Sequence, residues 1–89
     1  MKNNVVAIKP SDNVAVAITS IKAGERIVLG TAAGGLEARQ NIPKGHKVAL
    51  KRISEGGEIL KYGQVIGHAG REIQPGDHVH THNLRYQES

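Results

Sequence analysis

The feature that most constrains the fold is a short pattern that occurs four times, Ile-x-x-Gly-x-x-Ile or Val. A Gly at a fixed place supplies the positive φ of a tight turn, and the β-branched residues on either side favour strands. The repeats begin 11 to 21 residues apart, which leaves little room for long helices. We therefore predict a mostly β fold of short strands and tight turns, with corners at residues 21–27, 42–48, 53–59 and 73–79.

Other segments fit the same picture. Residues 4–9 and 14–19 are short β-branched runs separated by a Pro-Ser-Asp-Asn cluster of turn formers, which predicts a first hairpin-like pair. Residues 46–51 also favour a strand, although their composition would permit the start of a helix through Ser54. No low-complexity segment or linker divides the chain, which predicts one domain over residues 1–89.

Composition narrows the class of protein. A chain of 89 residues suits one small domain, and the absence of Cys removes thiolate chemistry and is compatible with a reducing cytosol. The net charge is +4, but the basic residues are scattered and the only aromatic residues are two tyrosines, which argues against nucleic acid. The N-terminus is too poor in apolar residues for a signal peptide, and no run approaches the roughly 20 residues of a membrane span. We expect a soluble, cytoplasmic protein that does not enter a membrane.

Three of the five histidines, His78, His80 and His82, recur at a spacing of two residues. Imidazole is a common metal ligand and titrates near neutral pH, so the row suits metal binding or proton transfer. In an extended strand the three rings would share one face, and they face outward if Val79 points into the core as the repeat predicts. Neighbouring histidines would lie roughly 6.6–6.8 Å apart along the strand, so at most two should share a metal ion. The alternative is that three polar residues occupy the solvent face of an edge strand.

The remaining candidates are ambiguous on pattern alone. His46 follows a turn Gly and His68 follows Gly67, so both are predicted at corners that reach a cleft, although a lone loop histidine is more often solvated. Lys61 lies beside a turn, where it could bind a carboxylate or only keep the surface soluble. The sequence contains no GxSxG, Walker, HExxH or dinucleotide motif. These residues make an incomplete active site.

Taken together, the motifs resemble a known family. From about Val6 to Arg85 the chain is similar to the N-terminal domain of the altronate dehydratase family, whose relatives include galactarate dehydratase and the small subunit of sulfolactate sulfo-lyase. The resemblance implies a SAF domain with a β-clip fold that accompanies a much larger catalytic portion, fused or separate, and a homo-oligomer is possible. The matching segments are residues 12–17, 45–50, 53, 61–63, 66–67 and 78–83.

The resemblance also implies a function. Such enzymes remove water from a sugar acid to give a 2-keto-3-deoxy acid, with divalent iron or manganese as cofactor. It implies catalytic roles for His80, His82 and His46, and metal contact by His78, His80 and His82. The substrate-binding residues that it implies are Lys61, Asn83, Arg85, Asp12 and Asn13, although turn chemistry alone would explain the Asp-Asn pair.

One departure from the family pattern concerns the first turn, where relatives often carry a histidine and this chain has Lys9. A protonated Lys cannot ligate a metal and favours an anionic group instead. Two alternatives to a sugar-acid dehydratase stay open. The chain could be a non-catalytic module that binds an acid or supports assembly, or the small subunit of a sulfo-lyase from which sulfite leaves.

Overall fold

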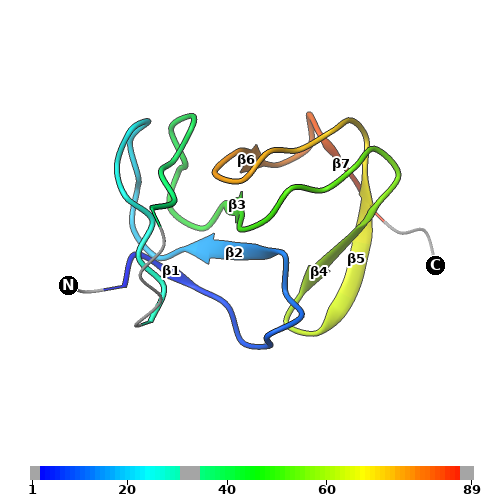
Figure 1. Ribbon diagram of the computed structural model, residues 1–89, viewed down its shortest axis with the longest axis horizontal. Coiled ribbons are helices and arrows are strands. Elements are labelled where there is room, and N and C mark those ends of the chain that lie inside the picture. The colour runs from blue at the N-terminus through cyan, green and yellow to red at the C-terminus, as the bar shows by residue number, and fades with distance from the viewer. Residues whose placement is uncertain (1–2, 31–34, 87–89) are drawn as a thin grey trace.

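The computed structural model describes residues 3–30 and 35–86, and the regular elements within them are all β-strands (Figure 1). Four strands form an antiparallel sheet in the order β1-β2-β3-β6, and three form a second one in the order β4-β5-β7. The prediction of a mostly β fold is confirmed. The described residues contain no helix long and apolar enough to cross a membrane. The strands are β1 (Val5–Val6), β2 (Val14–Ala17), β3 (Lys47–Ala49), β4 (Glu58–Lys61), β5 (Gln64–Ala69), β6 (His78–Val79) and β7 (Leu84–Tyr86).

The four repeats form four turns of the same kind. In each, the amide after the turn Gly donates to the carbonyl three residues earlier, as from Glu25 to Lys22 at 2.9 Å and from Asp77 to Gln74 at 3.0 Å. Only Gly adopts a positive φ at this place without strain, which explains why every repeat has it. The predicted corners are confirmed, with φ angles of 90° at Gly24, 85° at Gly45, 82° at Gly56 and 91° at Gly76.

The repeats associate in two pairs, and each pair builds one part of the core. Ile21 and Ile42 form an antiparallel bridge between the first two repeats, and Ile53 and Ile73 form one between the last two. The first and last residues of every repeat are at least 95 % buried. Those of the first pair, with Ala15 among others, make one apolar cluster, and those of the second pair make another.

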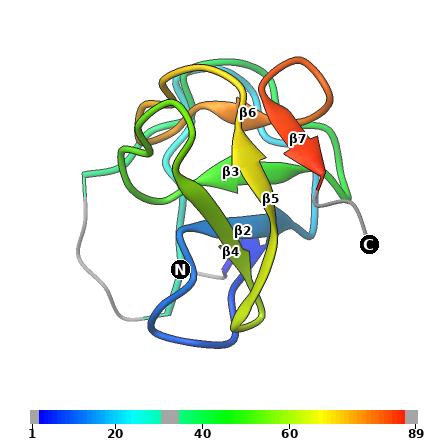
Figure 2. The ribbon, with the colours of Figure 1, turned by 90° about the vertical axis from the view of Figure 1, so that its right-hand side faces the viewer.

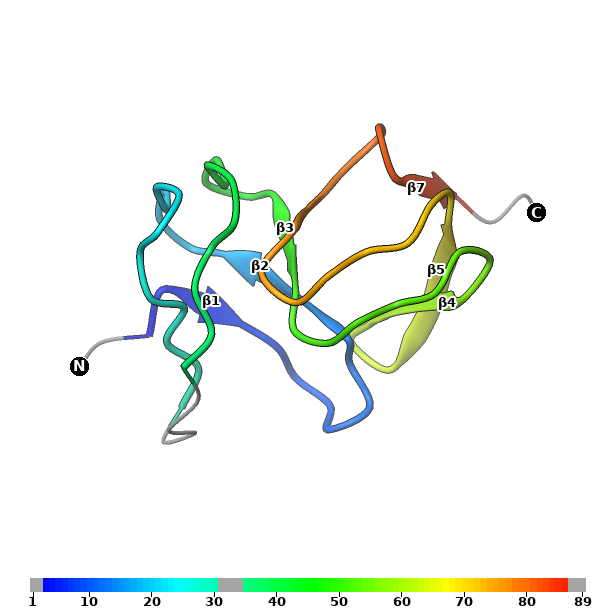
Figure 3. The ribbon, with the colours of Figure 1, turned by 45° about the horizontal axis from the view of Figure 1, so that its top comes forward.

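The four-stranded sheet lies between these two clusters. Because successive side chains of a strand point to opposite faces, Ala15 of β2 and Val48 of β3 belong to the first cluster, whereas Val14 and Ala49 belong to the second. Figure 2 shows the β4–β5 hairpin crossing β2 and β3 on the side of the second cluster, and Figure 3 shows β1 and β7 toward opposite ends of the molecule. The sheet is therefore covered on both sides, by short loops on one and a hairpin on the other.

The predicted strands occur, but they are shorter than expected. The first pair is β1 with β2, in the register Val5 to Ala17, and residues 47–49 are a strand rather than a helix. The prediction of an extended strand through residue 82 is wrong. β6 ends at Val79, which is buried as predicted, and residues 80–83 form a turn. The side chain of Asn83 causes this turn, because it binds main-chain groups of His78 and His80.

Candidate functional site

The strand register brings a fourth histidine to the row. β3 pairs with β6 so that Lys47 lies opposite Val79 and Val48 opposite His78. Continuing this register by one residue places His46 opposite His80, and their rings stack with centroids 4.2 Å apart. Opposite residues on antiparallel strands are the closest cross-strand neighbours, which is why two histidines 34 positions apart in the sequence touch.

His46, His78 and His80 form one group, which we call the histidine cluster. Each is half-buried, and each offers one ring nitrogen such that the three atoms lie within 4.8 Å of one another. Nδ1 of His46 is 2.9 Å from Nε2 of His78, a hydrogen bond whose direction depends on the tautomers. Two members of the predicted row thus converge with a histidine from another strand. The third, His82, is exposed on the turn and stays outside this group, with its ring 5.2 Å from that of His78.

The surroundings of His78 and His80 favour their neutral imidazoles. Burial lowers the pKa of His78, and the neighbouring His46 lowers it further because two imidazolium charges repel. Burial likewise lowers the pKa of His80, with further contributions from His46 and Lys47. The Nδ1 atom of His80 is buried and has no hydrogen-bond partner among the described residues. In the tautomer that carries its proton on Nε2, this unpartnered Nδ1 offers a lone pair to a cation.

Two amides hold the cluster in place. Asn83 is 96 % buried, accepts a hydrogen bond of 2.9 Å from the amide of His80, and donates one of 2.9 Å to the carbonyl of His78. Oε1 of Gln40 accepts a hydrogen bond of 2.7 Å from the amide of His78, and its Nε2 donates to Asp77 at 3.1 Å. The polar atoms of Asn83, which the resemblance offered for substrate binding, are therefore used inside the protein.

Asp12 and Asn13 lie elsewhere and connect the two sheets. Asp12 is buried, and its carboxylate accepts hydrogen bonds from the amides of Ile8, Lys9 and Gly63. Asn13 accepts one from the amide of Leu60 at 2.7 Å and donates one to the carbonyl of Glu58 at 2.8 Å. Both side chains bind backbone about fifty positions away, so they do more than form a local turn. Their part in substrate binding stays a prediction.

The other predicted residues are spread over the surface. Lys61 ends β4, with its Nζ 5.0 Å from the centre of the Tyr62 ring, and Arg85 is exposed on β7. His68 does not lie at a corner as predicted. It is exposed within β5, because the strand continues to Ala69, and it is not a member of the histidine cluster.

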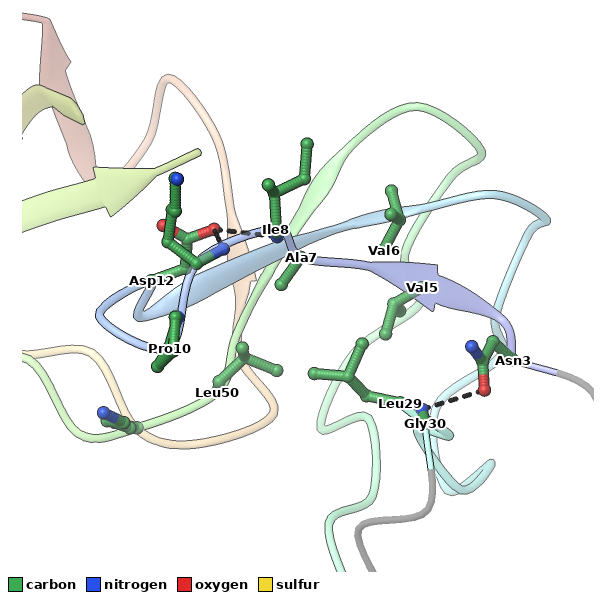
Figure 4. Close-up of a pocket in the computed structure, with 12 residues that line it drawn as sticks. Asn3, Val5, Val6, Ala7, Ile8, Pro10, Asp12, Leu29, Gly30 and Leu50 are labelled. Carbon is green, nitrogen blue, oxygen red and sulfur yellow. Dashed lines mark hydrogen bonds between the residues drawn. The ribbon is translucent and has the colours of Figure 1, made fainter. Parts of the chain in front are cut away.

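One cavity lies along β1, and no histidine is among its lining residues (Figure 4). Its volume is about 550 Å³, and most of its lining is apolar, including Val6, Ile8 and Leu29. Asp12 and Lys9 are at one end, where the first turn contacts the β4–β5 turn. Lys9, the departure from the family pattern, therefore lies in this apolar cavity. A second, smaller cavity of about 340 Å³ has His82, Arg71 and Arg85 among its lining residues.

Sequence reasoning missed Gln40, Lys47 and Arg71. Gln40 and Lys47 contribute through pairings that only the fold creates: Gln40 by a hydrogen bond across 38 positions, and Lys47 by its place beside His80. Arg71 is one of several scattered basic residues, and no spacing distinguishes it. His46 had a weak signal, its place directly after a turn Gly.

An all-β fold of short strands with a histidine cluster at one sheet edge defines a small domain built around repeated turns. The chain belongs to the altronate/galactarate dehydratase SAF domain family, whose model matches residues 3–87. This confirms the resemblance drawn from the motifs.

Relatives fall into two groups. The chain is 41 % identical over 80 residues to an altronate dehydratase of Bacillus subtilis (strain 168), and 42 % identical over 76 residues to a galactarate dehydratase (L-threo-forming) of Escherichia coli (strain K12). The matches cover 90 % and 83 % of this chain but only 16 % and 14 % of those proteins. It is also 46 % identical over 50 residues, 56 % of this chain, to the (2R)-sulfolactate sulfo-lyase subunit alpha of Paracoccus pantotrophus, with 75 % of that subunit covered. Two relatives are thus much longer than this chain, and the third is a subunit of similar size.

Proposed function

We propose that this chain is the small portion of an altronate dehydratase-like hydro-lyase, in which it contributes the histidine cluster to a site shared with a larger catalytic portion. The observation that carries the proposal is the convergence of three half-buried imidazoles within 4.8 Å on a domain that matches only 16 % of an altronate dehydratase. A chain this small has no room for a complete substrate site of its own. We expect it to be inactive alone.

The cluster fits the divalent iron or manganese that the resemblance implies. Its three ring nitrogens converge, the pKa values of two members are lowered, and one buried nitrogen has no hydrogen-bond partner in the described part of the chain. His46, His78 and His80 would hold the ion, which differs from the set of three row histidines given by the resemblance. A bound divalent ion supplies Lewis-acid stabilisation of negative charge on carboxylate and hydroxyl oxygens.

The chain's own side chains would handle proton and anion. Loss of water from a sugar acid requires removal of a weakly acidic proton beside the carboxylate and protonation of the departing hydroxyl. His82 is exposed beside the cluster, so its ring can exchange a proton with a substrate that approaches from solvent or from the partner surface. Arg85 is exposed and Lys61 is half-buried, and the positive charge of both can attract the acid.

The test is reconstitution. The chain is mixed with the large chain of an altronate dehydratase from which the homologous domain has been removed, together with ferrous or manganous ion, and formation of the 2-keto-3-deoxy acid is followed. We expect turnover only when both chains are present. His80→Ala and His46→Ala should abolish it, whereas His68→Ala, which removes an exposed imidazole outside the cluster, should not. Turnover unaffected by the first two substitutions would contradict the proposal.

The apolar cavity along β1 favours a second candidate, a non-catalytic module that supports assembly. This cavity is larger than the one beside His82 and contains none of the histidines. If assembly is the whole function, His80→Ala and Val6→Asp should change the amount of complex in a sedimentation experiment. The turnover of the complex that does form should then stay constant.

The match to a sulfo-lyase subunit favours a variant of the leading proposal. That subunit is itself small, and 75 % of it is covered. A free-standing chain paired with a separate large subunit would then release sulfite rather than water. Colorimetric detection of sulfite from sulfolactate, run beside the assay for 2-keto-3-deoxy acid, separates these two leaving groups.

A further inference from the structure

The smaller cavity lies where the turn after β6 meets the edge of the second sheet. It has a volume of about 340 Å³, and its lining includes Gly70, Arg71, Thr81, His82 and Arg85. These residues come from two segments, the end of the β5 strand and the turn into β7, which a hydrogen bond of 2.8 Å from the amide of Gly70 to the carbonyl of Asn83 holds together. The cavity is therefore part of the folded framework and not the gap beside a single loop.

The lining of this cavity is positively charged. Two arginines and one histidine are among its lining residues, and no acidic residue is. Within residues 3–30 and 35–86, the ion pairs are Arg39 with Asp77 and Arg52 with Glu72, so neither Arg71 nor Arg85 has an acidic partner there. Two arginines on one concave surface raise the local concentration of anions, and each can donate paired hydrogen bonds to a carboxylate.

Gly70 gives Arg85 its place in the cavity. A Cβ at position 70 would be 3.1 Å from Nε of Arg85, 3.5 Å from its Cγ and 3.7 Å from its Cδ. The stem of Arg85 therefore lies across the bare backbone of Gly70, the residue that precedes Arg71 in the lining of the cavity. The pairing of β5 with β7, in which Arg85 lies opposite His68, fixes the start of that stem.

The cavity adjoins the histidine cluster. His82 lines the cavity, and its ring lies 5.2 Å from that of His78, a member of the cluster. Asn83, next along the chain, binds the backbone of two cluster members. An acid bound in this cavity would therefore lie beside His82, the histidine that adjoins the cluster.

We propose that Arg71 and Arg85 form a binding site for the carboxylate of a hydroxy acid, with the Thr81 hydroxyl beside it to meet a hydroxyl of the ligand. Arg71 is the new element of this site. In taking the ligand to be the acid on which the assembled enzyme acts, the inference rests on the proposed function. Binding of the acid to this chain alone requires neither metal nor partner.

The test is an NMR titration of the ¹⁵N-labelled 89-residue chain with sodium gluconate, a hydroxy acid with one carboxylate. Sorbitol, which has the same carbon chain without the charge, is the uncharged control, and sodium chloride keeps the ionic strength constant. We expect saturable shifts at the amides of residues 70–71 and 81–85 and at the Nε–H of Arg71 and Arg85, with sorbitol giving none. Arg71→Gln should weaken gluconate binding about tenfold or more, because a charged donor is lost.

A matched variant separates a local contact from the overall field. Arg26→Gln removes the same charge from an exposed arginine of the first repeat and should leave the affinity within about twofold. Equal weakening by both variants, or shifts spread over the surface, would overturn the site. Because Arg71 is exposed, the rest of its variant's spectrum should match the original and so report an intact fold.

If the reconstituted enzyme fails to turn over while gluconate still binds here, the proposed function fails and the site stands. If the reconstituted enzyme turns over but gluconate does not bind to the chain, the proposed function stands and the carboxylate site fails.

Discussion

Asn83 fixes the turn that carries His80, because its Oδ1 accepts a hydrogen bond of 2.9 Å from the amide of His80. The same side chain donates to the carbonyl of His78, so both ends of the amide are satisfied while the side chain is 96 % buried. The turn ends the β6 strand at Val79 and bends the backbone so that His82 leaves the row. One buried amide thereby decides which histidines belong to the cluster.

Replacing Asn83→Ala should lower the free energy of unfolding by about 1–3 kcal/mol, the usual cost of an unpaired buried polar group. It should also weaken Mn²⁺ binding, because His80 would no longer be held beside His46. Urea denaturation and Mn²⁺-induced broadening of NMR signals measure the two effects. Asn41→Ala is the matched control: Asn41 also accepts from a backbone amide, that of Ala23, but on the exposed surface. Asn41→Ala should lower the free energy of unfolding by less than Asn83→Ala does, and it should leave Mn²⁺ binding unchanged.

The lowered pKa values of His78 and His80 predict a stability that falls in mild acid. Their ordinary value is 6.5, and both are shifted below it chiefly by burial. As the pH drops through 6.5, these histidines are therefore protonated in the unfolded chain before they are protonated in the folded one. The free energy of unfolding falls until the pH is below their pKa values in the folded state. Urea denaturation between pH 8 and pH 4, done at fixed salt, checks the slope. NMR titration of the ring signals would contradict the expectation if either histidine became protonated at or above pH 6.5.

The same shifts predict the pH dependence of metal binding. A metal requires deprotonated ring nitrogens, so protons compete with it, and the lowered pKa values of His78 and His80 keep these two ligands available in mild acid. We expect Mn²⁺ affinity to fall as the pH decreases through the folded pKa values of His78 and His80. Loss of a residue that only supports a metal ligand typically reduces metal affinity by roughly 10–100-fold. Because His80→Ala removes a ligand itself, we expect it to reduce Mn²⁺ affinity at neutral pH by at least about this factor. Isothermal titration calorimetry measures both, with His68→Ala as the control, and an affinity unchanged in His80→Ala would contradict the assignment.

The local part of the fold could be predicted from the sequence, and the non-local part could not. The Gly of each repeat requires a turn because of its own φ, and Ile59 and Val79 require burial because of their own apolar surface. The pairing of Ile21 with Ile42 depends instead on which turns meet in space. His46 joined the site for the same reason, since its place opposite His80 follows from the register of β3 and β6. Arg71 had no local signal at all.

Asp12 in the first turn makes a second pH-dependent contribution to stability. Here the folded state favours the charged form of the side chain, whereas in His78 and His80 it disfavours it. Burial by itself raises the pKa of Asp12, but hydrogen bonds from the amides of Gly63, Lys9 and Ile8 outweigh it, and the net pKa lies below 3.8. A depressed folded pKa contributes stability that is present above the unfolded value and lost as the pH falls through the folded one. Asp12→Asn should therefore be less stable than the original at pH 7, with a difference that shrinks below about pH 4. Glu55→Gln, at an exposed carboxylate, should show no such convergence in the same urea experiments.

Gly24 and Gly76 occupy the same place in two repeats, with φ angles of 90° and 91°, but their surroundings differ. Among residues 3–30 and 35–86, a Cβ at Gly24 would meet nothing within 4 Å, whereas one at Gly76 would lie 2.1 Å from the carbonyl oxygen of Glu37. Gly24→Ala should cost only the backbone strain, about 1–2 kcal/mol. Gly76→Ala adds displacement of the backbone around Glu37, next to the segment that holds His78 through Gln40. We expect it to cost clearly more and to weaken Mn²⁺ binding, which Gly24→Ala should leave intact. Equal losses of stability in urea denaturation would show that the turn alone, and not this contact between repeats, requires the glycine.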